Sequence, residues 1–410
     1  MNHVLRGGQK LNKYKDWILE FAQIPGNAYR FLGDNVDSDG RYIKNENLNN
    51  GFTYYSDKSL INDDFLLIST FEPSKVDSIV IKLVEIRTSK EIYRWGFNEK
   101  TFNDVIDISN TTRFLHPLLL KDKSLIFINW DADFIKTDDW LIKVDSNSRV
   151  QWINKNHFHH SIEKEDENTI WTCTKSESSL QEKQLLVHDN LTTFGDAIIK
   201  IKIQNNKILF KKTILSIIQE NNLNEVLFSG TVEDDLIHLN DVQPALYNTK
   251  HWDKGDLLIS LRNKSTILLY RPSTNKILWY KTGPWLNQHD CDFYGQSKIT
   301  LFGNDVVRYS GGDDFINGTS NQYVFDFETN EVSKPYHKLF TDYQIKTKTE
   351  GRSDILTNDD IFVDESNSGR IIIGNKEALK AVYAERIDKK NIKMFNWVRY
   401  IKKEDFLKVQ

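Results

Sequence analysis

Three short histidine motifs carry the clearest chemical signal in the sequence. Ten histidines occur, and several stand in polar clusters at the ends of apolar runs, namely HFHH at 157–160, HLND at 238–241 and QHD at 288–290. Arg262 lies between the last two motifs, in the segment SLRNK. A neutral imidazole offers a lone pair for nucleophilic attack and can carry a proton in either direction. A guanidinium can hold two oxygens of an anionic group at once. Together these groups suit the transfer of a charged group.

The same histidines also permit a metal site. On a strand, His157 and His159 would share one face while His160 points away. Adding His238 and His289 would complete a set of three imidazoles of the kind that binds zinc or copper. The acids in the last two motifs could orient an imidazole as readily as bind a metal. We therefore favour a site that needs no metal and keep the metal site as the alternative.

Short β-rich runs supply the elements that must position these residues. Val, Ile, Phe, Tyr and Trp dominate runs such as 65–70 and 257–261, and clusters of Asn, Asp, Ser and Gly separate them. This composition is typical of antiparallel strands joined by turns. Helical periodicity is confined to short segments at 13–23, 214–221 and 377–385. The sequence therefore predicts an all-β protein.

Five hairpin-like segments repeat one scheme. Each has a strand of alternating apolar residues, a polar turn and a second strand that usually ends in an aromatic: 79–95, 140–153, 197–210, 267–280 and 323–336. Because such a hairpin buries its apolar faces only against neighbouring units, the repeat predicts radial packing. We expect a six-bladed β-propeller with four antiparallel strands per blade and long loops. Residues 1–60 would form an entry segment and a partial blade, and residues 61–410 a single propeller domain.

Propeller geometry would gather the motifs into one place. Equivalent strand ends from different blades converge on one end of the central channel, so residues far apart in sequence can share a polar site. The tryptophans in or near hairpin ends are expected to pack the blades: Trp95, Trp152, Trp279 and Trp397.

Composition narrows the classes of partner. Lys and Arg total 54 against 58 Asp and Glu, a net charge of -4, so no global basic excess favours a nucleic-acid backbone. The two cysteines, Cys173 and Cys291, are too far apart for a CxxC motif and cannot build a disulfide framework. No run approaches the roughly 18 apolar residues of a membrane span, and the first residues lack an apolar signal core. We expect a soluble protein, or a mature form from which a signal was removed.

The segments that hold the motifs resemble the bacterial arylsulfotransferases, which do not use the nucleotide donor PAPS. A double His in FHHSIE, a His-x-Asn-Asp in HLNDVQP, a Ser-Leu-Arg in SLRNKS and a Gln-His-Asp in NQHDCDF appear in the order of that family. The resemblance covers most of the chain, from about residue 75 to about residue 400. It implies the same six-bladed propeller that the repeats predict.

The resemblance also implies catalytic roles. His289, in QHD, matches the histidine that is transiently sulfated in the family. His238 and Arg262 match its supporting residues. The double histidine leaves open whether His160 or His159 is the third supporting group.

Substrates follow from the same resemblance. Asn240 and Gln288 would contact the substrate, and Trp285 would line a pocket for the aryl group. The implied reaction is ping-pong transfer of a sulfuryl group from an aryl sulfate donor to a phenolic acceptor through a sulfohistidine. No G-x-x-x-x-G-K-[ST] loop is present to cradle a nucleotide donor. No cofactor is expected.

Cellular context and activity stay open at this point. The resemblance implies a periplasmic or extracytoplasmic protein if a signal was removed, and otherwise the location is cytoplasmic. It also leaves a homodimer open. The alternative function is a catalytically silent propeller that serves as a scaffold for a ligand or a protein. An enzyme predicts that His289, His238 and Arg262 converge at the channel mouth, whereas a scaffold predicts that they are scattered.

Overall fold

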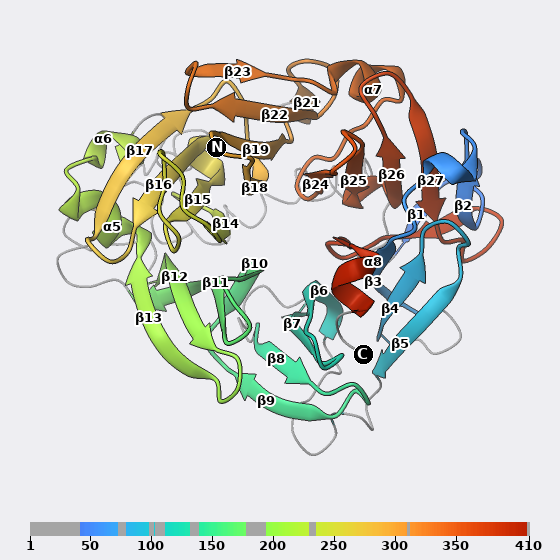
Figure 1. Ribbon diagram of the computed structural model, residues 1–410, viewed down its shortest axis with the longest axis horizontal. Coiled ribbons are helices and arrows are strands. Elements are labelled where there is room, and N and C mark those ends of the chain that lie inside the picture. The colour runs from blue at the N-terminus through green and yellow to red at the C-terminus, as the bar shows by residue number, and fades with distance from the viewer. Residues whose placement is uncertain are drawn as a thin grey trace, which may run out of the picture.

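Six antiparallel sheets stand radially around a common axis in the computed structural model (Figure 1). The structure describes residues 42–72, 79–97, 102, 111–131, 139–177, 194–228, 235–309 and 312–407. Five of the sheets have four strands and the sixth has five. The predicted all-β class and the six-bladed β-propeller are thereby confirmed.

We number the blades from 1 to 6 and give the strands of each from the inner to the outer edge. Blades 1 to 3 are β29 (Arg399–Ile401), β3 (Phe65–Phe71), β4 (Ile79–Glu85) and β5 (Glu91–Phe97); β6 (Thr111–Leu119), β7 (Leu125–Asp131), β8 (Leu141–Val144) and β9 (Val150–Asn154); and β10 (Phe158–Lys164), β11 (Thr169–Glu177), β12 (Phe194–Lys202) and β13 (Lys207–Thr213). Blades 4 to 6 are β14 (Leu239–Pro244), β15 (Leu257–Leu261), β16 (Thr266–Arg271) and β17 (Lys276–Thr282); β18 (His289–Tyr294), β19 (Lys298–Gly303), β22 (Asn321–Asp326) and β23 (Glu331–Ser333); and β24 (Arg352–Ile355), β25 (Ile361–Glu365), β26 (Arg370–Gly374), β27 (Leu379–Ala384) and β2 (Gly51–Tyr54).

Helices and small ribbons decorate this ring. Two two-stranded sheets lie outside the blades: the hairpin of β20 (Val306–Tyr309) with β21 (Gly312–Phe315), and the pair of β1 (Tyr42–Lys44) with β28 (Asn391–Lys393) from opposite ends of the chain. The helices are α5 (Ile214–Glu220), α6 (Asn224–Phe228), α7 (His337–Asp342) and α8 (Lys403–Leu407), with 3-10 turns η2 (Lys58–Leu60), η3 (Arg262–Lys264) and η4 (Ser366–Ser368). Within the described ranges, no helix is long and apolar enough to cross a membrane.

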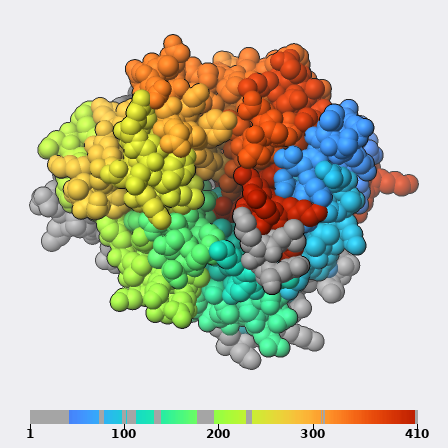
Figure 2. Space-filling model, in the orientation of Figure 1, coloured from blue at the N-terminus to red at the C-terminus, as the bar shows by residue number. Residues whose placement is uncertain are grey.

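The two ends of the described chain close the ring. The late strand β29 pairs with β3 as the inner strand of blade 1, with Arg399 opposite Leu67. The early strand β2 pairs with β27 as the outer strand of blade 6, with Gly51 opposite Ala384. In Figure 2 the blue N-terminal strands accordingly lie directly beside the red C-terminal segment. The described part of the expected entry segment therefore contributes a strand to the last blade.

The repeated hairpins have a common structural meaning. All five form the third and fourth strands of their blades, from β4–β5 in blade 1 to β22–β23 in blade 5. The helix expected at 214–221 is α5, whose N-terminus is capped by the Thr213 hydroxyl accepting from Ser216 N. The expectation of a helix at 377–385 is wrong, because this segment forms β27, which pairs with β26 on one side and β2 on the other. The helix expected at 13–23 lies outside the described residues.

Buried apolar faces hold neighbouring blades together. Trp95 is fully buried between blades 1 and 2, Trp152 packs between blades 2 and 3, and Trp279 packs between blades 4 and 5. Full burial of one large apolar side chain stabilises a fold by about 1.5–3 kcal/mol. The expected packing role of these three tryptophans is confirmed.

Candidate active site on the inner strands

Four histidines from four consecutive blades gather near the axis. His116 lies on β6, His160 on β10, His238 directly before β14 and His289 at the start of β18. The ring of His160 lies 5.0 Å from that of His238, 6.2 Å from that of His289 and 6.5 Å from that of His116, measured between centroids. The inner strands thus bring together residues that are far apart in sequence.

An unusual backbone conformation aims these side chains. His116, His160 and His238 have φ angles of 50°, 57° and 52°, in the left-handed region that side chains other than glycine rarely adopt. Such a residue costs about 1–3 kcal/mol and persists where the surrounding structure imposes it, often at functional sites. The pairing register shifts at the same places, between His159 and Ile162 and between Leu115 and Leu118. These bulges turn the histidines out of the regular alternation of a strand.

The tautomer of His289 is fixed by a chain of hydrogen bonds. Its Nδ1 lies 2.6 Å from Asn304 Oδ1. Asn304 Nδ2 donates to the carbonyl oxygens of Thr347 and Glu350, at 2.8 Å each, so the other amide atom must be the acceptor. His289 therefore carries its proton on Nδ1, and Nε2 keeps a lone pair. Nε2 is buried without a partner among the described residues.

Burial and a neighbouring charge keep His289 neutral. The residue is 0% exposed. Burial first, and then the positive charge of Arg262, hold the pKa of His289 well below its ordinary value. An uncharged imidazole with a free Nε2 is the nucleophilic form.

Arg262 stands beside this nucleophile in the 3-10 turn η3. It is 3% exposed, its backbone N donates to His238 O at 3.1 Å, and its Nη1 donates to Asn263 Oδ1 at 3.0 Å. Asp256, at the opposite end of β15, is paired with Arg271 through two bonds of 2.7 Å. The charge of Arg262 lowers the pKa of His289, so its guanidinium acts directly on that imidazole.

His238 is oriented by a carboxylate. Its Nδ1 hydrogen-bonds Asp235 Oδ2, which leaves Nε2 for a substrate. Burial acts to raise the pKa of Asp235, but the hydrogen bond and charge of His238 outweigh it and lower that pKa to about 2. Asp235 is thus a carboxylate at neutral pH and holds the His238 ring through Nδ1.

The double histidine divides into an inner and an outer ring. His160 contacts the other histidines of the cluster, whereas His159 lies behind it, with the two Nδ1 atoms 2.9 Å apart. His159 Nε2 lies 3.5 Å from Asp196 Oδ1 and has no hydrogen-bond partner among the described residues. Either Nδ1 atom can donate in the bond between the two rings, and when His159 donates, His160 carries its proton on Nε2. Burial lowers the pKa of His159 to about 4, against the opposing effect of Asp196.

Asn240 and Gln288 are buried in contacts that hold the site. Asn240 Nδ2 donates to the backbone oxygen of Gln288 at 2.7 Å, and Asn240 Oδ1 is buried without a described partner. Gln288 Nε2 donates to Ser260 Oγ at 3.0 Å, which ties the residue before His289 to the strand before Arg262. Gln288 is 0% exposed and its Oε1 has no hydrogen-bond partner among the described residues, so its contact with a substrate stays a prediction.

The aromatic residue beside the histidines is Trp397. Trp285 is 0% exposed in the core between blades 4 and 5, edge-on to Tyr323 at 5.9 Å, and its role in an aryl pocket stays a prediction. Trp397, expected only to pack blades, stacks on His116 at 4.2 Å and lies 5.4 Å from His289. Its φ of 61° repeats the left-handed conformation of the histidines.

Sequence reasoning missed His116 and Asn304. His116 stands alone in FLHPLLL, and the only available cue was its place one blade ahead of the HFHH motif. Asn304 follows β19 in a polar turn that looks like any other. Its role depends on two carbonyls from a distant loop, which the sequence does not reveal.

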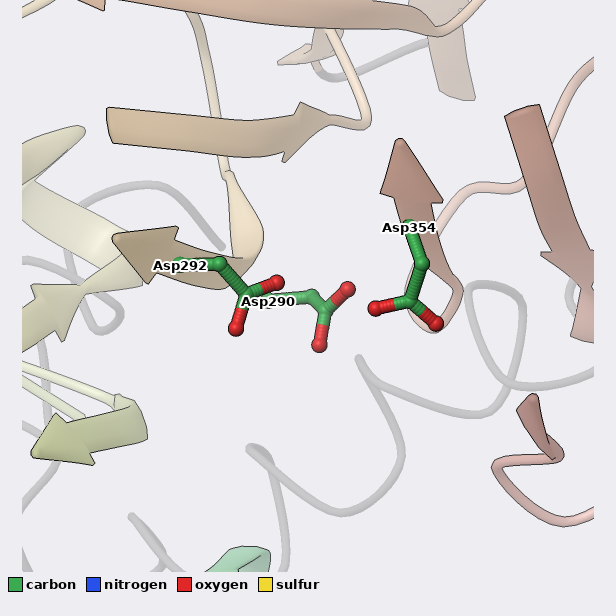
Figure 3. A group of neighbouring side chains, drawn as sticks. All are labelled: Asp290, Asp292 and Asp354. Atoms are coloured by element: carbon green, nitrogen blue, oxygen red, sulfur yellow. The ribbon is translucent and has the colours of Figure 1, made fainter. Parts of the chain in front are cut away.

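The group of possible metal ligands found in the described part of the chain contains no histidine. Among the described residues, the ligand atoms that lie within 4.8 Å of one another belong to Asp290, Asp292 and Asp354 (Figure 3). Arg352 Nη2 lies 3.1 Å from Asp290 Oδ1, and Ser353 N donates to Asp290 Oδ2 at 2.9 Å. Burial, partly offset by Arg352, raises the pKa of Asp290 well above its ordinary value. This acidic group is thus largely satisfied by protein atoms.

A cavity of about 710 Å³ occupies the opposite ends of the inner strands. Its lining includes Phe293, Arg352, Arg399 and Tyr400. After burial, the charges of Arg399 and Arg352 contribute most to lowering the pKa of His116. A charged layer therefore separates this cavity from the histidine cluster.

The chain matches one protein family in sequence. A family model described as arylsulfotransferase (ASST) matches residues 116–383, more than half of the chain. No curated protein matches. Among solved structures, a protein of unknown function from Bacteroides caccae has a TM-score of 0.46 and 10% identity, covering 82% of this chain and 99% of its own. The nidogen/laminin complex has a TM-score of 0.44 and 8% identity, covering 82% and 98%.

Proposed function

Because the chain belongs to the arylsulfotransferase family, we propose that it moves a sulfuryl group from an aryl sulfate to a phenol through a sulfohistidine at His289. The state of that imidazole carries the proposal. Asn304 holds the proton on Nδ1, and the buried Nε2 keeps its lone pair beside Arg262. Such a nucleophile needs no further base to unmask it.

In the first half-reaction, His289 Nε2 attacks sulfur and the bond between sulfur and the aryl oxygen breaks. The sulfated ring keeps its Nδ1 proton, which stays hydrogen-bonded to Asn304 Oδ1. Protonated His238 gives its Nε2 proton to the departing phenolate, while Asp235 holds Nδ1. Arg262 and His160 stabilise the charge on the sulfuryl oxygens.

The second half-reaction returns the site to its first state. The acceptor phenol gives its proton to His238 Nε2, and its oxygen attacks sulfur. The bond between sulfur and His289 breaks, and the electron pair returns to Nε2. Because His289 is fully buried, water is held away from the intermediate between the two halves.

Turnover of 4-nitrophenyl sulfate with a phenol acceptor tests this proposal. We expect nitrophenolate release with the parallel-line kinetics of a ping-pong reaction. His289→Asn should lower kcat by at least about 10⁴-fold, because removal of a catalytic nucleophile leaves only binding and charge stabilisation.

His251→Asn is the matched control, since His251 stacks on Phe327 at the outer side of the blades and should keep full turnover. Wild-type turnover by His289→Asn would remove the nucleophile assignment. A wild-type protein that neither cleaves nor transfers with any aryl sulfate would favour the silent scaffold.

A further inference from the structure

One imidazole of the cluster has no hydrogen-bond partner in the described part of the chain. His116 is 3% exposed, and neither of its ring nitrogens has a hydrogen-bond partner among the described residues. A buried polar group that is left unpaired costs about 1–3 kcal/mol. Native proteins rarely leave such groups unpaired, and an exception calls for a functional explanation. Two unpaired nitrogens on one ring, at the edge of a candidate active site, indicate that a ligand supplies the partner.

The surroundings of His116 define how large that ligand group can be. Its ring stacks on Trp397, with centroids 4.2 Å apart and planes inclined by 24°. The centroid of His160 lies 6.5 Å away, beyond a direct hydrogen bond between the two rings. That separation suits one small oxyanion that accepts a bond of about 2.9 Å from each imidazole. The left-handed backbone at His116 matches that of His160 and His238.

We propose that His116 is a substrate-binding residue that donates a ring N–H to a sulfuryl oxygen of the aryl sulfate, with Trp397 holding its ring in place. This inference rests on the proposed function and adds a contact for its transferred group. No described protein group fixes the tautomer of His116, so whichever nitrogen faces the sulfuryl group can carry the proton.

The charge state of His116 fits this role. Burial, followed by the charges of Arg399 and Arg352, holds the pKa of His116 well below its ordinary value. A neutral ring donates one hydrogen bond without adding a further buried positive charge to those of Arg352 and Arg399. At His116 the sulfuryl group would then meet a neutral donor.

Two variants separate ligand binding from packing. His116→Phe keeps a flat ring against Trp397 but removes both nitrogens, and His116→Gln restores an N–H donor. Titration calorimetry with inorganic sulfate should show binding weakened about 10-fold or more in His116→Phe, as expected for a hydrogen bond to a charged group. His116→Gln should recover part of the affinity. The KM for 4-nitrophenyl sulfate should rise in the same order, while the Tm of His116→Phe stays equal to or above that of the wild type.

His251→Phe is the control and should bind sulfate as the wild type does. Unchanged sulfate affinity and unchanged KM in His116→Phe would overturn the proposal. If His116→Phe melts early, His116→Gln decides between the two roles. A wild-type Tm with sulfate affinity below that of the wild type supports the proposal. A wild-type Tm with the sulfate affinity of the wild type overturns it. Sulfate binding does not depend on turnover, so it distinguishes failure of this inference from failure of the proposed function. If the wild type transfers no sulfuryl group but His116→Phe still binds sulfate more weakly than the wild type, the proposed reaction is refuted and the sulfate-binding role of His116 stands.

Discussion

The position of one proton governs the chemistry of His289. Two backbone carbonyls orient the Asn304 amide, the amide oxygen accepts a hydrogen bond from Nδ1–H, and Nε2 keeps a lone pair. This chain of hydrogen bonds contains no charged group. Burial and the positive charge of Arg262 lower the pKa of the imidazole, and in the proposed mechanism Arg262 would also stabilise the sulfuryl group.

Arg262→Lys tests the role of the guanidinium. Lysine keeps the charge but loses the planar fork that holds two oxygens, so kcat should fall on the order of 10²-fold, as after loss of one donor to a developing oxyanion. The donor KM should change much less, and the Tm should stay near that of the wild type. Steady-state kinetics and thermal unfolding of the one variant provide both readouts.

Arg271→Lys is the matched control for that variant. It breaks the two-point pair with Asp256 far from the histidines, so it should lower the Tm and keep kcat. If Arg262→Lys instead lowers only the Tm and leaves kcat unchanged, Arg262 is a structural residue and leaves the proposed mechanism.

At the scale of strands, three buried acids join neighbouring blades close to the axis. Asp241 Oδ2 accepts from Cys291 N at 2.7 Å, Asp290 Oδ2 from Ser353 N at 2.9 Å and Asp364 Oδ2 from Val398 N at 2.8 Å. These backbone donors lie at or beside the inner-strand segments that carry the site, so the carboxyl groups fix how one blade sits against the next. Burial raises the pKa values of these three acids and therefore favours their neutral forms.

Asp364 should make stability depend on pH. Burial raises its pKa from 3.8 to about 7, although the hydrogen bond from Val398 N opposes this. Since the folded pKa lies above the unfolded one, the folded state binds the proton more tightly. The stabilisation is present below about pH 4 and is lost as the pH rises to about 7. The Tm of the wild type should therefore fall across this window relative to that of Asp364→Asn.

Asp342→Asn, at an exposed pair with Lys338, controls for general effects of charge removal. Parallel Tm profiles for the wild type and Asp364→Asn would show that Asp364 does not titrate in this window.

Local patterns in the sequence predicted the strands well and the inner bulges poorly. The five outer hairpins are local units whose alternation and polar turns are visible in the sequence. The sixth, β26–β27, was missed because Glu377, Ala378 and Lys380 favour a helix, and only pairing with β26 and β2 overrides them. The choice between His159 and His160 stayed open because a bulge breaks the alternation from which side-chain direction is inferred.

At the scale of the whole molecule, the last strands complete both the ring and the site. β29 supplies the inner strand of blade 1, and Arg399 on it pairs with Glu163 of blade 3 at 2.9 Å and 3.1 Å. Trp397, just before β29, packs against His116 and His289. No pattern along the chain reveals that contact, because it exists only once the ring has closed.

Truncation tests this closure. A chain that ends after Val398 lacks β29 and exposes the inner edge of β3, so it should lose its single cooperative thermal transition. A chain that ends after Lys402 keeps β29 and loses only α8, chiefly the packing of Phe406 on Phe65, and should melt cooperatively at a moderately lower temperature. Equal transitions for the two chains would contradict the role assigned to β29.

The covalent intermediate tests the central claim most directly. The protein is incubated with 4-nitrophenyl sulfate without an acceptor, quenched at neutral to alkaline pH and mapped by peptide mass spectrometry. The account predicts the added mass of one sulfuryl group on the peptide that contains His289, its removal when phenol is supplied before the quench, and no such mass in His289→Asn. Release of nitrophenolate with no sulfated peptide, or a sulfuryl group on another residue that persists in His289→Asn, would contradict it.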